Sequence, residues 1–230
     1  MTRALLFGLI ASSALVAGSL IGTHWRVPKR LLAVMLAFAG GALIAALSYE
    51  LFDEAFRQGG AVTAGGALLA GAAAFIALDE LLLDRFRKLA TGLALLVAVT
   101  LDGIPENLAL GTTLVTDTGS LALLVAIFVS NFPEALVGAS KMRQKGQSVR
   151  AINLIWLATA VLLAGAVAGG ASLFAASPPG TLSMALGFAA GAVLASLADT
   201  VMPEAYRDGG PLVAFATVAG FFVSFMLNTI

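Results

Sequence analysis

Eight apolar runs of membrane-spanning length occupy almost all of this 230-residue chain. A helix needs roughly 20 predominantly apolar residues to cross the hydrocarbon core of a bilayer. Little of the chain is left over for a soluble domain, so residues 1–230 are expected to form a single transmembrane domain. The expected spans are 4–22, 31–52, 62–82, 90–115, 120–140, 151–173, 182–202 and 211–229.

Composition indicates that these spans are helices. The chain is 60% hydrophobic and 11% charged, whereas about a quarter of a soluble domain is charged. Ala, Leu and Gly dominate, and the alternating β-branched pattern of a barrel is scarce, so the prediction is an all-α polytopic bundle. The chain has no cysteine, which excludes disulfides and thiolate metal sites. Its balanced charge gives no indication of a nucleic-acid partner.

The first run follows Met1-Thr2-Arg3 and also resembles a signal peptide. No convincing cleavage site precedes the basic cluster at Arg26, Lys29 and Arg30, so we retain this run as the first span.

Basic residues predict the orientation. Eleven of the thirteen Lys and Arg residues fall in the loops after spans one, three, five and seven, and only Arg3 and Arg57 fall on the other side. Basic loops stay in the cytoplasm, so both termini are expected outside the cell membrane. Trp25, Trp156 and Tyr206 are expected at the inner interface, where aromatic residues gather.

Residues 39–60 resemble residues 189–210, which lie 150 positions later. Ten of the 22 aligned residues are identical, including a shared Glu-Ala-(Phe/Tyr)-Arg-x-Gly-Gly tail. The two segments belong to spans two and seven, which run in opposite directions. We therefore expect spans 1–3 and 6–8 to be inverted repeats around spans 4–5, an arrangement typical of secondary transporters. The alternative is that two Ala-rich helices converged on similar ends.

Spans four and five carry similar polar interruptions: Asp102-Gly103-Ile104-Pro105-Glu106-Asn107 and Ser130-Asn131-Phe132-Pro133-Glu134-Ala135. Residues four apart share a helix face, which pairs Asp102 with Glu106 and Ser130 with Glu134. Packed antiparallel, the two spans would bring three carboxylates together near the middle of the membrane.

The two prolines add backbone oxygens to these side chains. Proline cannot donate a hydrogen bond to the carbonyl four residues earlier, which frees the oxygens of Leu101 and Val129. Carboxylates and carbonyls are the ligands that hard and borderline divalent cations use. No Lys or Arg lies in spans four or five, so protons or a cation must neutralise the acids. Protonated carboxyls that only bridge helices are the alternative to a cation site.

In its span layout and its two Pro-Glu segments, the chain resembles the ZIP (Zrt/Irt-like) family of divalent metal transporters. The family has eight spans, both termini outside, related inverted halves, and metal-binding motifs of the form H-N-x-P-E-G on span four and H-x-x-P-E or H-N-x-P-E on span five. The specific likeness covers about 20 residues, namely the two Pro-Glu segments, the Leu108-Ala109-Leu110-Gly111 that follows the first, and Ser48-Tyr49-Glu50-Leu51 on span two.

The resemblance implies a metal site made by six residues. Glu106 and Glu134 match the family's metal-binding carboxylates, and Asn131 matches a position that can also bind metal. Asp102 and Ser130 stand where the family has histidines, and Asn107 stands where it has glycine. Gly103 replaces a usual polar residue, and together with the change at Ser130 this puts the family's second metal site in doubt. The His-rich loop common between spans three and four is also missing.

The expected substrate is a divalent metal ion moved into the cytoplasm through an all-oxygen site, with no permanently bound cofactor. Zinc is the family default, and manganese or iron(II) are contenders, because a site without imidazole favours harder ions. Besides the metal and the lipid bilayer, a second copy of the chain in a homodimer is an allowed partner.

Two rival functions stay open. The same carboxylates could relay protons in a carrier of another small solute. An intramembrane enzyme ranks last, because the chain has no H-E-x-x-H, no G-x-S-x-G and no cysteine.

Acids near the span ends have two interpretations each. Glu50, Asp53 and Glu54 are either an outer entrance or solvated helix-end residues. Asp199 and Glu204 are candidates for an inner exit, and Pro203 is expected to kink or end span seven. Asp79 and Glu80 are expected on a solvated face.

Overall fold

The computed structural model describes residues 1–25, 27–86, 91–115 and 121–229, with the backbone alone for residues 82–86 and 91–98. Nearly all of these residues are helical, and no β-strand occurs among them. The helices are α1 (Thr2–His24), α2 (Lys29–Ala46), α3 (Asp53–Phe86), α4 (Thr91–Thr113), α5 (Leu121–Gln144), α6 (Val149–Leu173), α7 (Pro179–Ser196), α8 (Met202–Gly209) and α9 (Leu212–Asn228). The expectation of an all-α bundle is confirmed.

Several helices are long and apolar enough to cross a membrane. Five stretches among the described residues meet this description: Thr2–His24, Lys29–Leu81, Leu121–Gln144, Val149–Leu173 and Pro179–Gly209. Large apolar side chains also cover the outside of the bundle, for example Val62, Leu69 and Phe215, which are 89%, 72% and 76% exposed. A protein with this surface needs an apolar surrounding, which fits a multi-pass membrane protein.

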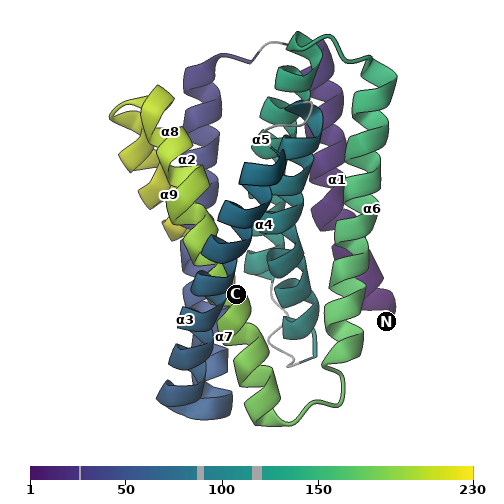
Figure 1. The fold of residues 1–230 in the computed structure, drawn as a ribbon. Coiled ribbons are helices and arrows are strands. Elements are labelled where there is room, and N and C mark those ends of the chain that lie inside the picture. Colours follow the sequence, from purple (N-terminus) through teal and green to yellow (C-terminus); the bar gives the residue numbers. More distant parts are fainter. Residues whose placement is uncertain (26, 87–90, 116–120, 230) are drawn as a thin grey trace.

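The two segments that are similar in sequence also share unusual backbone features. Short π-helical segments follow α2 and α7, at Leu47–Phe52 and Leu197–Val201. Each is followed by a helical stretch that breaks at a glycine of positive φ, Gly60 at 73° and Gly210 at 63°. Only glycine adopts this conformation without strain. The break at Gly60 lies inside α3, so the long stretch from Lys29 to Leu81 is not one straight helix (Figure 1).

Glycines let these helices approach one another closely. α2 packs along α9, and α3 packs along α7. In each of these pairs two glycines face a backbone carbonyl so closely that a Cβ atom would collide with it. The contacts are Gly41 with Thr217, Gly220 with Phe38, Gly191 with Leu68, and Gly71 with Phe188.

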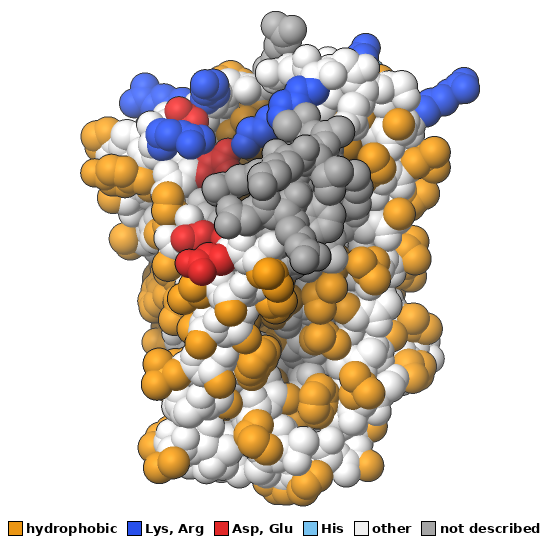
Figure 2. All heavy atoms as spheres, viewed as in Figure 1, with side chains coloured by type: hydrophobic (Ala, Val, Ile, Leu, Met, Phe, Trp, Pro, Cys, Tyr) orange, Lys and Arg blue, Asp and Glu red, His pale blue; other side chains and the backbone are white. Residues whose placement is uncertain are grey.

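Charged side chains gather at one end of the bundle. On the face shown in Figure 2, Lys and Arg side chains crowd one end, and most of the remaining length is apolar or uncharged. The N-terminus of α1 lies at the opposite end (Figure 1). This distribution agrees with the bias of the basic loops in the sequence.

Two local expectations are revised. Trp156 does not face outward as a residue of an aromatic belt would, because it is 1% exposed and packs in a core cluster with Leu15 and Ile152. Pro203 does not end its span, because the helical stretch Pro179–Gly209 continues past it, and the π segment Leu197–Val201 directly precedes α8.

Candidate functional site

Pro105 and Pro133 both lie inside continuous helices, α4 and α5. The two helices are in contact with each other. Each proline removes one backbone hydrogen bond from its helix. The interruptions expected from the sequence therefore lie on neighbouring helices within the bundle.

On α4 the three predicted residues differ in their surroundings. Asp102 is half-buried and has the side chain of Ser196 on α7 as a hydrogen-bond partner. Glu106, one turn further, is 7% exposed. Asn107 is fully buried, and its Nδ2 donates to the carbonyl of Gly103 at 2.8 Å. Its Oδ1 has no partner among the described residues.

On α5 a hydroxyl and a carboxylate form a pair. The Oγ of Ser130, which is fully buried, donates to Oε1 of Glu134 at 2.8 Å. Asn131 is 1% exposed, and neither its amide nitrogen nor its amide oxygen has a hydrogen-bond partner in the described part of the chain. Buried polar groups without partners are uncommon, and Asn131 is the residue of these two motifs in which both polar side-chain atoms lack one among the described residues.

Asp102 and Glu134 line the same cavity, which we call the central cavity. Its volume is about 160 Å³, and its walls also include Leu36, Val99, Thr200 and Val201. A single water needs roughly 10–15 Å³, so this space accommodates an ion with part of its hydration shell. Oxygen ligands and water together are what hard divalent cations use.

Glu106 completes a group of three neighbouring carboxylates. It interacts electrostatically with Glu134 and Asp102. Yet the described residues contain no group of three or more acidic or histidine side chains spaced closely enough to hold a metal ion by themselves. A cation in the central cavity would therefore bind one or two carboxylates and take its remaining ligands from hydroxyl, amide, backbone or water oxygens.

The neighbourhood of Gly103 is filled by an apolar side chain. A Cβ atom on Gly103 would lie 2.6 Å from Cδ1 of Leu163 on α6. This is the position where the resembled family has a polar residue. Leu163 is fully buried, so the space beside Gly103 offers no oxygen from α6 at this point.

Two acids beyond α4 and α5 also belong to this region: Asp199, already a candidate for an inner exit, and Asp79, which the sequence pattern does not place here. Asp79 on α3 and Asp199 on the π segment after α7 interact electrostatically with Asp102. Asp79 is half-buried rather than on a solvated face. The helical period of α3 alone gives no signal for this, because its apolar residues surround the whole helix.

The acids of the second span are not simple solvated residues. Glu50 and Glu54 are 2% and 8% exposed, whereas the side chain of Asp53 is 45% exposed and pairs with Arg57 at 2.7 Å. Oε1 of Glu50 accepts the backbone N–H of Leu123 at 3.1 Å. Leu123 lies in the first turn of α5, where backbone N–H groups lack helical partners. Glu50 therefore caps the N-terminus of α5.

No protein-family model matches this chain, and no curated protein matches it.

Proposed function

We propose that this protein transports a divalent transition-metal ion across the cell membrane into the cytoplasm, as the ZIP-like motifs suggest. One observation carries this proposal: Asp102 and Glu134, from two proline-interrupted neighbouring helices, line one cavity inside the bundle. Ionisable groups at membrane depth are costly and are usually functional. Glu106, Ser130, Asn107 and Asn131 are the candidates for the remaining oxygen ligands, with no more than two carboxylates bound to the ion at once.

The proposed architecture has eight spans, with spans 1–3 and 6–8 as inverted repeats around α4 and α5. The π segments and the positive-φ glycines support it, because Leu47 and Leu197, and likewise Gly60 and Gly210, lie 150 positions apart. Helix contacts support it too. In the proposed repeat, span two (α2) corresponds to span seven (α7), and span three (α3) corresponds to span eight (α9). The α2–α9 pair is therefore the counterpart of the α7–α3 pair, and both pairs have the same kind of glycine-to-carbonyl contact.

The conformation is open toward the basic end. Glu204 lines the central cavity, and its side chain is 37% exposed. Its counterpart in the repeat, Glu54, is 8% exposed and accepts a hydrogen bond from Gln58 at 2.7 Å. If the basic loops are cytoplasmic, the cavity faces inward, and both termini are outside.

The all-oxygen ligand set bears on which metal is carried. The chain has no cysteine, and its only histidine, His24, does not line the central cavity. The site therefore has no thiolate or imidazole ligand. Oxygen ligands suit manganese and iron(II) better than they suit softer ions. Zinc remains the default on resemblance, because affinity order still places it above manganese.

Metal uptake by the purified protein in liposomes tests the proposal. We expect uptake of Zn, Mn or Fe(II), and a loss of about tenfold or more in Glu134→Gln and Asp102→Asn, because each removes a charged ligand. Glu80→Gln is the matched control, since Glu80 is an exposed acid on α3 outside the central cavity. Equal uptake by all four proteins would refute the metal site.

The same liposomes test the rival carrier function. Metal-independent proton flux that disappears in Glu134→Gln, with no metal uptake by the unsubstituted protein, would favour a proton-coupled carrier of another solute.

A further inference from the structure

A second cavity adjoins the central cavity on the side of the basic end of the molecule. We call it the mouth cavity; its volume is about 280 Å³, and Lys29, Gln144, Arg207 and Asp208 line it. The two cavities share four lining residues: Leu36, Val137, Lys141 and Glu204. Two of these are charged, and they come from different helices, α5 and α8.

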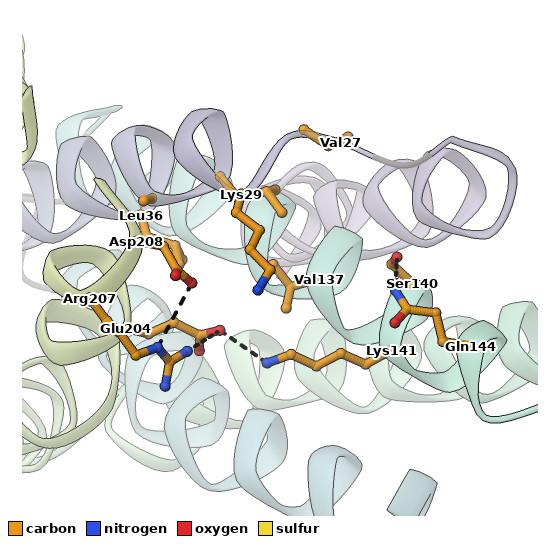
Figure 3. Close-up of a pocket in the computed structure, with 12 residues that line it drawn as sticks. Val27, Lys29, Leu36, Val137, Ser140, Lys141, Gln144, Glu204, Arg207 and Asp208 are labelled. Atoms are coloured by element: carbon orange, nitrogen blue, oxygen red, sulfur yellow. Dashed lines mark hydrogen bonds and ion pairs between the residues drawn. The ribbon is translucent and has the colours of Figure 1, made fainter. Parts of the chain in front are cut away.

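Lys141 and Glu204 form an ion pair at this junction. The Nζ of Lys141 lies 3.0 Å from Oε1 of Glu204, as Figure 3 shows. Arg207 lies on the other side of the same carboxylate, with its Nη2 3.8 Å from Oε1. The side chains of Lys141 and Glu204 are 49% and 37% exposed, so water reaches the pair.

Lys141 stands on the same face of α5 as Glu134. The two residues are seven apart, which is two helical turns and a rise of roughly 10 Å. Val137 lies between them, and all three line the central cavity. An ion that leaves Glu134 toward the basic end therefore passes the ammonium of Lys141.

We propose that Lys141 is a specificity-determining residue of this path. Its ammonium is a tethered cation that occupies Glu204 where the two cavities meet. A mobile cation must displace the ammonium to reach the carboxylate, and an anion meets no such competition. Exposed ion pairs are weak, so the displacement is compatible with passage. The proposal depends on the proposed function, because it assigns to Lys141 a role in the passage of the same ion.

Cysteine accessibility tests this role without metal transport. The chain has no cysteine, so Thr200→Cys places a single thiol in the wall of the central cavity, beyond the ion pair. Inside-out vesicles expose the basic end to two methanethiosulfonates of similar size, one cationic and one neutral. Val99→Cys, also in the wall of the central cavity, is a second thiol position.

We expect Lys141 to lower the rate of the cationic reagent relative to that of the neutral one. Lys141→Met should raise the rate of the cationic reagent about tenfold and leave the neutral rate nearly unchanged, because one unit charge near the path is removed. Lys141→Arg should keep the low cationic rate. Lys145→Met is the matched control, since Lys145 follows α5 by one residue but lines neither cavity.

An unchanged ratio of cationic to neutral rates in Lys141→Met, at both thiol positions, would overturn the proposal. An equal rise in Lys145→Met would do the same, because it would indicate general surface charge. The two proposals can also fail separately. If the liposomes take up no metal but the ratio of cationic to neutral labelling rates depends on Lys141, the metal function is refuted and the charge role of Lys141 stands. Where uptake is observed, Lys141→Met should also change its maximal rate.

Discussion

Asn131 is the residue whose burial most needs an explanation. Its amide is 1% exposed, and neither polar atom has a partner among the described residues. Ser130, directly before it, is equally buried but donates to Glu134. A buried amide without partners destabilises a fold. Under the proposed function, the amide oxygen of Asn131 binds the metal ion during transport, which would explain why an unpaired amide is buried here.

Asn131→Leu should therefore raise stability and lower metal binding. The substitution replaces an unpaired amide with an apolar group of similar size, and we expect a gain of about 1 kcal/mol in the absence of metal. Thermal unfolding in detergent, with and without the metal, measures both effects.

Ser183→Ala is the control for the Asn131 experiment. Ser183 is fully buried, and its Oγ donates to the carbonyl of Ala55 at 2.7 Å, so its loss should lower the melting temperature. A lower melting temperature in Asn131→Leu as well would indicate that Asn131 has a structural role.

Helix packing in this molecule depends on individual glycines. Gly66 and Gly71 both lie on α3. Gly71 faces the carbonyl of Phe188 on α7, whereas a Cβ atom on Gly66 would meet no heavy atom within 4 Å. Substituting each glycine by alanine therefore distinguishes an effect on helix packing, at Gly71, from an effect on helix propensity alone, at Gly66.

We expect Gly71→Ala to destabilise the protein and Gly66→Ala to leave it unchanged or more stable. Alanine favours a helix over glycine by about 1 kcal/mol, which is the whole effect at Gly66. At Gly71 the added methyl group pushes α3 away from α7 and separates many other contacts. Melting temperatures of the two variants should thus shift in different directions, and equal shifts would contradict the close approach.

The prolines show what an element-level pattern can and cannot predict. The sequence places Pro105 and Pro133 within apolar runs, and both are inside helices as expected. Pro203 is expected to kink or end its span, and the helical stretch instead continues past it to Gly209, directly after the π segment Leu197–Val201. A proline in an apolar run therefore does not by itself predict that a helix ends.

At the scale of the whole molecule, the cavities lie toward the basic end of the bundle. The central cavity and the mouth cavity adjoin each other, and the mouth cavity is lined by Lys29, Lys141 and Arg207. If that end is cytoplasmic, as the positive-inside rule predicts, the proposed transport would release the ion into the cell from this conformation.

Single cysteines at the two ends of α6 test this orientation. Lys145 precedes α6 at the basic end, and Ser172 is exposed in its last turn. A 25-residue helix is long enough to cross a bilayer. We expect an impermeant maleimide to label Ser172→Cys from outside intact cells, and Lys145→Cys only after permeabilisation. The reverse pattern would change the proposed direction from import to export.

The sequence by itself determines the environment of this protein and the position of its polar interruptions. Long apolar runs and a low content of charged residues, 11% of the chain, predict membrane helices, because bilayer thickness sets their length. Spacing along one helix predicts that Ser130 faces Glu134, and the structure has them bonded.

Only the tertiary structure decides which distant groups meet. The Lys141–Glu204 pair joins residues 63 apart, and the Glu50 cap joins residues 73 apart. Helix periodicity predicts which face a residue occupies but not which helix packs against that face. The neighbours of Asp102, the leucine that fills the space beside Gly103, and the lysine at the inner end of the path all depend on that packing.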